Sequence, residues 1–195
     1  MFVKNAIAYY RNQTFLSRRL LIVYEGTTSL SVEDSSAGWS DISFIKLPDT
    51  TLTLGARRNY AIERCETEFF CIWDDDDWHH PQRLEVQIQN LLSTGKPSNV
   101  LSRVMLFDAL QKQMYLSSER YWEGTLLCRR DIFSDNIRYG LVNKGEDDDL
   151  LSKLKKRELV SLTTAPYLYT YVYHGNNTWD ENHFRRLFSA GYPVE

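Results

Sequence analysis

The sequence predicts an α/β protein with a mostly parallel sheet flanked by helices and a small antiparallel element in its C-terminal half. Strand-like and helical segments alternate through the first half, which is typical of parallel sheets. The strand-like runs are continuously apolar, as in strands that are covered on both faces. The 195 residues are 43% hydrophobic and 25% charged, which is an ordinary composition and length for one globular domain. We therefore expect a single domain over residues 1–195.

Apolar periodicity and turn residues define the expected elements of the first half. Apolar residues at the spacing of one helix face predict a helix that begins at residue 3. Pro48 ends the second strand, and Pro81 takes the first position of a helix that continues to Gly95. The expected order is helix 3–13, strand 18–26, loop 27–40, strand 42–48, helix 53–68, strand 69–73 and helix 81–95.

The second half of the sequence is less regular. Residues 100–118 predict a hairpin, and residues 124–133 predict a strand that enters a short helix. Residues 145–159 predict a helix, because acids fill the first turn and lysines the last, which matches the helix dipole. An aromatic strand at 167–175 and a short helix at 181–191 complete the expected elements.

Composition excludes several classes of protein. With 23 Lys and Arg against 26 Asp and Glu, the net charge is −3, so no positive field attracts nucleic acid. The longest apolar runs have five residues, whereas a membrane span needs about 20, and the N-terminus lacks a signal peptide's apolar region. Three cysteines without metal-like spacing are expected to be reduced thiols. We expect a cytoplasmic protein with no nucleic-acid partner and no transmembrane segment.

Four consecutive carboxylates at residues 74–77 are the sharpest local feature. They follow an apolar strand, at the position where open α/β sheets bind ligands, and they lie between Trp73 and Trp78. Adjacent carboxylates repel one another unless solvent or a cation neutralises them, and a hard divalent cation prefers oxygen ligands. The alternative is a solvated loop that caps the following helix.

Three further segments carry candidate functional groups. Residues 146–149 are consecutive acids, which either serve chemistry or stabilise the first turn of a helix. His174 ends a strand, where a lone histidine is either a ligand or a structural hydrogen-bonding group. Arg57 and Arg58 lie near a helix start, which suits a phosphate, although paired arginines are otherwise simply solvated.

In this order and spacing, the segments resemble the family-2 glycosyltransferases of the GT-A fold. Residues 6–26 are similar to the family's first helix and following strand, and residues 54–87 to its Gly-x-x-Arg-Asn helix, strand and DxD loop. GEDDDLL at 145–151 is similar to the acceptor-site motif, and YVYHGNNTW at 171–179 to the C-terminal histidine segment. The resemblance covers about residues 5–180 and implies a GT-A-type, Rossmann-like sheet.

The resemblance implies transfer of a sugar from a nucleotide-sugar donor to an acceptor hydroxyl, with inversion and with Mn²⁺ or Mg²⁺ as cofactor. The acceptor would be a glycan, a lipid-linked sugar or a protein. A cation offsets the charge of the leaving diphosphate, and a carboxylate base takes the proton of the acceptor hydroxyl. The implied residues are Asp147 as the base; Glu25, Arg58, Asn59, Asp74 and Asp75 for the donor nucleotide; Trp122, Gly124 and Glu146 on the acceptor side; and Asp76, Asp77 and His174 for the metal.

The sequence also departs from the family pattern. It begins inside the helix that should follow the family's first strand, so we expect a domain that is N-terminally truncated relative to the family, and only Glu25 remains of an acidic pair. A missing central strand leaves unpaired backbone groups that cost about 1–3 kcal/mol each when buried. The alternatives are a non-catalytic relative that binds metal or nucleotide only, and a metal-dependent phosphoesterase. The four scattered histidines disfavour the phosphoesterase.

Overall fold

The computed structural model describes residues 2–25, 40–48, 51–134 and 136–194, so most of the expected loop at 27–40 lies outside the described residues. The chain divides into two compact units. Unit 1 comprises residues 1–15, 71–127 and 159–195, and unit 2 comprises residues 16–70 and 128–158. The divisions near residues 70 and 127 fall within strands β3 (Phe69–Cys71) and β8 (Trp122–Arg129). The single-domain organisation stays a prediction.

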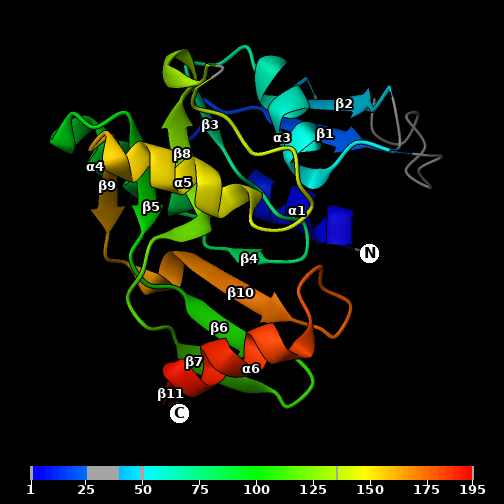
Figure 1. Cartoon of the computed structure of the whole chain (residues 1–195), viewed down its shortest axis with the longest axis vertical. Coiled ribbons are helices and arrows are strands. Elements are labelled where there is room, and N and C mark those ends of the chain that lie inside the picture. The colour runs from blue at the N-terminus through cyan, green and yellow to red at the C-terminus, as the bar shows by residue number, and fades with distance from the viewer. Residues whose placement is uncertain (1, 26–39, 49–50, 135, 195) are drawn as a thin grey trace. The chain divides into compact units, whose positions relative to one another are not determined.

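Unit 1 contains helices and strands from three separate stretches of the chain (Figure 1). Besides most of β8, its elements are α1 (Phe2–Arg11), β4 (Trp78–His79), α4 (Arg83–Thr94), β5 (Ser98–Leu101), β6 (Met105–Asp108), β7 (Gln113–Leu116), β9 (Val160–Thr163), η2 (Pro166–Leu168), β10 (Tyr169–Tyr173), α6 (Glu181–Ala190) and β11 (Tyr192–Val194).

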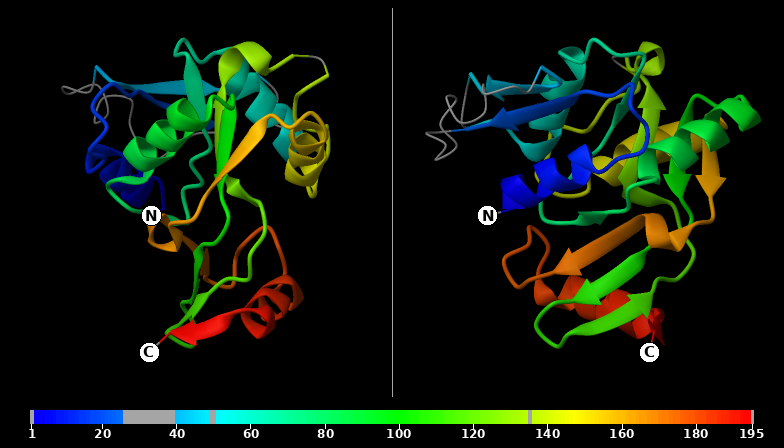
Figure 2. Two further views of the ribbon diagram at one scale, coloured as in Figure 1. Left: turned by 90° about the vertical axis from the view of Figure 1, so that its left-hand side faces the viewer. Right: turned by 180° about the vertical axis from the view of Figure 1, so that it is seen from behind.

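A five-stranded sheet in the order β11-β7-β6-β10-β4 forms one part of unit 1. Strand β10 pairs in parallel with β6, whereas the pairs β6–β7, β7–β11 and β10–β4 are antiparallel. Figure 2 shows β10, β6 and β7 side by side, with α6 behind them in the right-hand view. Phe184 of α6 is 1% exposed, and its ring lies 4.8 Å from Tyr171 and 4.6 Å from Tyr173.

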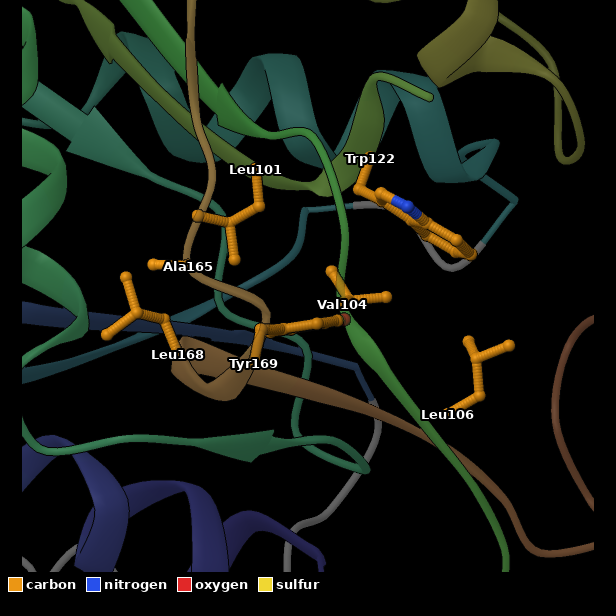
Figure 3. Packing of buried hydrophobic residues seen from close by; sticks show 7 residues of the cluster. All are labelled: Leu101, Val104, Leu106, Trp122, Ala165, Leu168 and Tyr169. Carbon is orange, nitrogen blue, oxygen red and sulfur yellow. The ribbon is translucent and has the colours of Figure 1, made fainter. Parts of the chain in front are cut away.

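The second sheet has the order β3-β8-β5-β9, and β5 pairs in parallel with β9. Helix α4 packs against both of these strands. Below them, a buried apolar cluster joins the two sheets of unit 1 (Figure 3). Its members are Leu101, Val104, Leu106, Trp122, Ala165, Leu168 and Tyr169. The cluster therefore connects β10 to the strand β8 that runs beside β5.

Unit 2 contains β1 (Leu20–Tyr24), β2 (Ile42–Lys46), α3 (Leu54–Glu63), η1 (Arg130–Ile132) and α5 (Glu146–Lys156), with the first part of β3 and the end of β8. Strands β1 and β2 form a parallel pair in which Leu20 lies opposite Ile42. Helix α3 contacts both β1 and α5. A Cβ atom at Gly55 would lie 1.8 Å from the carbonyl oxygen of Gly140, so α3 lies directly against the loop that precedes α5.

The predicted α/β class is confirmed, but the sheets are mixed rather than mostly parallel. The antiparallel part is larger than expected, because β4 and β11, which are too short to show a periodicity, add strands to it. Helix α4 begins at Arg83 and not at Pro81. The hairpin is limited to β6 and β7, since residues 98–101 pair with β9 instead.

Among the described residues, no helix has the length and apolar character needed to cross a bilayer.

Candidate active site

The acidic run at residues 74–77 follows β3 and lies in unit 1. Two hydrogen bonds fix Ile72 and Trp73, the residues that lead into this run. The backbone N–H of Ile72 donates to the carbonyl of Leu126 (2.9 Å), and the indole N–H of Trp73 donates to the carbonyl of Ala6 in α1 (3.2 Å). The run is therefore the continuation of a paired strand, and not a loose surface loop.

The carboxylate of Asp76 is oriented by the segment that follows β10. Its Oδ2 atom lies 3.1 Å from Nε2 of His174 and 3.3 Å from Nδ2 of Asn177. The same Asn177 side chain accepts from the backbone N–H of His174 (3.0 Å) and donates to the carbonyl of Val172 (2.8 Å). The structure thus brings together Asp76 and His174, which the sequence had paired, and adds Asn177, which it had not.

The hydrogen bonds of His174 define which ring nitrogen carries a proton. Its Nδ1 atom accepts from the backbone N–H of Asn176 (3.3 Å), so Nε2 carries a hydrogen and donates to Asp76. The ring of Phe2 lies 4.7 Å from the imidazole. A metal-binding imidazole needs a bare nitrogen and uses its other N–H as a donor. In this arrangement His174 therefore supports the Asp76 carboxylate.

Asp77 is buried at 2% exposure and is bonded at both oxygens. The hydroxyl of Tyr169 donates to Oδ2, and the backbone N–H of Val172 donates to Oδ1 at 2.8 Å. Burial, followed by the charges of Asp74 and Asp76, raises the pKa of Asp77 well above its usual range. Asp77 therefore links the acidic run to β10, whereas Asp75 is exposed.

Two residues that the sequence analysis missed, His79 and Arg83, lie beside the acidic run. His79 accepts from Arg83 at Nδ1 and contacts the carbonyl of Asp74 through Nε2 at 3.0 Å. Burial and the adjacent Arg83 lower the pKa of His79 well below its usual range, so this imidazole is neutral. Arg83 and Gln87 share one face of α4, but His79 lies in β4, so no helical spacing in the sequence indicated this contact.

The predicted acceptor-side residues are divided between the two units. Trp122 is 4% exposed in the apolar cluster of unit 1, and its buried indole N–H has no hydrogen-bond partner among the described residues. A Cβ atom at Gly124 would lie 3.0 Å from the Tyr169 hydroxyl and 3.3 Å from Oδ2 of Asp74. Gly124 therefore lies beside the acidic run, whereas Glu146 belongs to unit 2.

In unit 2, Arg58 connects the two acids at the start of α5. Its Nη1 atom lies 3.2 Å from Oε1 of Glu146 and forms a closer ion pair with Asp147. Glu146 is 3% exposed, and the guanidinium of Arg58 lies 5.3 Å from the ring of Tyr139. The predicted base, Asp147, is consequently held in a defined orientation by a partly buried cation.

Glu25 and Asn59, predicted to contact the donor, also have partners within unit 2. Glu25 pairs with Arg57 at 2.8 Å. Asn59 is 3% exposed, donates to the carbonyl of Tyr139 and accepts from the N–H of the same residue, both at 3.0 Å. Asn59 thereby joins α3 to the chain segment before α5.

The backbone amides at the start of α3 are bonded within the protein. The N–H of Leu54 donates to Asn143 (3.0 Å), that of Gly55 to the carbonyl of Val142 (3.1 Å), and that of Ala56 to Thr53 (3.3 Å). A free helix start binds anions through such N–H groups. Here two of them hold the loop at 140–145 and the third bonds Thr53, so these N–H groups already have partners within the protein.

The side chains of unit 1 fit a divalent cation that is only partly held by protein. Within the described parts of the chain, no three His, Cys, Asp or Glu side chains converge as a metal-binding group. Mg²⁺ at a nucleotide is commonly bound by one or two carboxylates, with phosphate and water oxygens completing its shell. Asp76, oriented through Oδ2 by two donors, would supply one such carboxylate, and its oxygen chemistry suits Mg²⁺ and Mn²⁺ alike.

The sequence model of the family described as "Glycosyl transferase family 2" matches residues 2–157. The chain belongs to this family, because the match covers well over half of its length.

Solved structures of S. aureus TarS share the fold. TarS 1-349 in complex with UDP is 14% identical with a TM-score of 0.68, over 95% of this chain and 65% of that one. TarS 1-349 in complex with UDP-GlcNAc is 14% identical with a TM-score of 0.70, over 90% and 56%. A further TarS structure is 13% identical with a TM-score of 0.69, over 95% and 39%. This chain therefore spans less than two thirds of each of these relatives. A search of curated proteins found no match.

Proposed function

We propose that this chain is a metal-dependent glycosyltransferase that moves a sugar from a nucleotide-sugar donor to an acceptor hydroxyl with inversion. The observation that carries the proposal is the Asp76 carboxylate, held by His174 and Asn177 in a chain that belongs to glycosyl transferase family 2. TarS, which shares the fold, has been crystallised with UDP and with UDP-GlcNAc, and this supports a nucleotide-sugar donor.

Unit 1 contributes the acidic run to donor binding, and the other predicted donor residues, Glu25, Arg58 and Asn59, belong to unit 2. Asp76 holds Mn²⁺ or Mg²⁺, with His174 in support, and Asp74 and Asp75 contact the donor. When bound, the cation neutralises charge on the diphosphate and makes it a better leaving group. Asp77 keeps its contacts to Tyr169 and Val172, so its part in the donor site is to hold the acidic run in place and not to bind the metal directly.

Acceptor activation is assigned to Asp147. A carboxylate within hydrogen-bond reach of the acceptor hydroxyl takes its proton as the oxygen attacks. A single base on the face opposite the leaving group gives one displacement and hence inversion, by analogy with inverting hydrolases. Arg58 orients Asp147, and the buried Glu146 holds Arg58. The acceptor would be a glycan, a lipid-linked sugar or a protein.

Turnover of a panel of nucleotide sugars with Mn²⁺ or Mg²⁺ tests the activity, and Asp147→Asn tests the base. Asn keeps the shape and removes the basicity, so transfer should fall by about 10²–10⁴-fold while donor binding is retained. Asp149→Asn is the matched control. It lies in the same helix turn, and its carboxylate pairs with Lys153 at 2.6 Å. Near-normal transfer by Asp147→Asn, or a larger loss in the control, would show that the base is misassigned.

Asp76→Ala tests the metal assignment. It should abolish metal-dependent nucleotide binding, measured by calorimetry, and leave the fold intact because it relieves repulsion among adjacent carboxylates. Unchanged affinity would contradict the assignment. Nucleotide binding by the wild type without transfer would favour the non-catalytic alternative, and release of phosphate from simple phosphate esters would favour the phosphoesterase.

A further inference from the structure

A chain of buried polar side chains runs from the acidic run along the inner face of α4. It consists of His79, Arg83, Gln87 and Asn99, which are 1%, 0%, 0% and 0% exposed. Arg83 and Gln87 lie four residues apart on α4, and His79 precedes Arg83 by four in β4. All four side chains belong to unit 1. The proposed chemistry uses none of them.

The members of this polar chain are hydrogen-bonded one to the next. Nε of Arg83 donates to Gln87 (3.1 Å), and Nε2 of Gln87 donates to Oδ1 of Asn99 (3.0 Å). Asn99 in turn donates to the hydroxyls of Ser161 and Thr163 in β9, both at 3.0 Å. Its far end is therefore fixed in the four-stranded sheet.

The near end is fixed to the backbone around the acidic run. Nη2 of Arg83 donates to the carbonyls of Ile72 (3.1 Å) and Gly124 (3.3 Å), while Nη1 donates to Nδ1 of His79. An arginine only donates, so His79 accepts at Nδ1 and its Nε2–H donates to the carbonyl of Asp74 (3.0 Å). The carbonyls of residues 72 and 74, on either side of Trp73, are thus both held.

The environment of Arg83 is unusual for a charge. Among the described residues it forms no ion pair with a carboxylate, and its donors go to neutral acceptors. Burying a charge without an opposite charge is costly, and an apolar side chain of similar volume commonly serves stability as well or better. The rings of Trp73 and Tyr169 lie 5.4 Å and 5.0 Å from its guanidinium. A contribution to stability alone therefore does not explain why the guanidinium of Arg83 occupies this position.

We propose that His79 and Arg83 are positioning residues that hold the backbone of residues 72–74 and so fix the direction in which the carboxylates of the acidic run point. The proposal rests on the proposed function, because the donor site is what this positioning serves. Four adjacent like charges separate when the backbone is free to move, and binding groups held before the ligand arrives need no reorganisation. Asp77 and Asp76 are also held from β10 and the 174–177 segment, so the support from His79 and Arg83 acts at the start of the run, on residues 72–74.

The test compares two substitutions of His79 with a control on the same helix. His79→Phe keeps a ring to stack on Trp73, whose centroid lies 3.7 Å away, but it removes both hydrogen bonds. His79→Gln keeps an amide donor for Asp74 and an acceptor for Arg83. Leu91→Ala is the control, because Leu91 is 3% exposed on α4 and is not part of the polar chain. All variants are measured at a temperature at which each is folded.

Backbone hydrogen exchange in the peptide that covers residues 72–78 is the first readout. Loss of the two bonds should speed exchange there about tenfold or more in His79→Phe, and His79→Gln should restore most of the protection. In Leu91→Ala, exchange in this peptide should rise only as much as the lower global stability of that variant requires. Unchanged exchange in His79→Phe, or an equal increase in Leu91→Ala, would overturn the proposal. If His79→Phe does not fold, Arg83→Lys, which keeps the charge and loses the fork, replaces it with the same expectation.

Affinity for UDP in the presence of Mn²⁺, measured by calorimetry, is the second readout. It should weaken about tenfold in His79→Phe and remain within about twofold of wild type in Leu91→Ala. Equal weakening in both variants would mean that the polar chain only stabilises the fold. If the wild type does not bind UDP, the donor assignment in the proposed function is wrong, and the exchange measurement still decides whether His79 and Arg83 position the acidic run.

Discussion

Substitution of Gly55 by alanine should destabilise the protein, although the same change stabilises most helices. Alanine in a helix interior is favoured over glycine by about 0.5–1 kcal/mol. At Gly55, however, the new Cβ atom would lie 1.8 Å from the Gly140 carbonyl oxygen and 3.2 Å from Cβ of Glu146. The first of these neighbours is backbone and cannot rotate away. The start of α3 and the loop at 140–145 must therefore separate.

The size of the effect follows from two opposing contributions. Forcing a methyl group into a packed site costs about 1–3 kcal/mol. Separation also weakens the bond from the N–H of Gly55 to Val142 (3.1 Å), a bond type that contributes about 0.5–1.5 kcal/mol. After the helix preference is subtracted, a net loss of about 2 kcal/mol in the free energy of unfolding remains. For a chain of this length that corresponds to a Tm about 4–8 °C lower.

Thermal unfolding followed by circular dichroism measures the shift. Gly140→Ala is the matched control on the opposite side of the same contact. Its Cβ atom would meet only side chains, the nearest being Oδ2 of Asp149 at 3.4 Å, so its Tm should change little. A higher Tm in Gly55→Ala would refute the reasoning, because helix preference would then outweigh the contact. Transfer activity should fall together with stability, since Arg58 lies one turn further along α3 and would move away from Asp147.

Two further predictions concern buried groups. Tyr169→Phe removes the hydroxyl that donates to the buried Asp77 and should lower the free energy of unfolding in urea by about 1.5–3 kcal/mol; a double-mutant cycle with Asp77→Asn should show coupling, and strict additivity would contradict the contact. Burial, followed by the charge of Asp131, raises the pKa of Cys128 from 9.0 to about 12, so the folded state keeps the thiol proton after the unfolded state has lost it. The retained proton stabilises the folded state fully below pH 9, and this stabilisation is lost as the pH rises toward 12. The free energy of unfolding of the wild type should therefore fall by up to about 1.4 kcal/mol per pH unit relative to that of Cys128→Ala in this range. A constant difference between the two proteins from pH 8 to pH 11 would exclude it.

The elements that could be predicted are those whose signal is local. The apolar runs of β1 and β3 and the helical period of α4 are visible in short windows, because burial on one face or on both leaves its period in the sequence. Strand β4 has two residues and exists through pairing with β10, about 90 positions away, so no window contains its cause. The extent of the antiparallel pairing was underestimated for this reason.

The candidate site likewise has features that the sequence predicts and features that it does not. The residue types at 74–77, 146–149 and 174 are enough to indicate carboxylate and imidazole chemistry, because that chemistry belongs to the side chains themselves. The direction of each side chain was not predictable, because it depends on contacts between distant segments. The hydrogen bond from Asn177 to Asp76 spans 101 positions, and the ion pair of Arg58 with Asp147 spans 89. An arginine at position 83 in an amphipathic pattern indicates a solvated residue, yet it is completely buried.

The separation in sequence between α3 and the segment before α5 has a consequence for folding order. The two hydrogen bonds between Asn59 and Tyr139 close a loop of 80 residues, and that loop contains all of residues 71–127 from unit 1. Contacts between residues so far apart in sequence form slowly, because the entropic cost of closing the loop is incurred before the contacts stabilise the fold. We expect the hairpin of β6 and β7 to gain protection early and the pairing of Arg58 with Asp147 to form late. A partly folded chain would then hold an assembled hairpin while its proposed base is still without a fixed orientation.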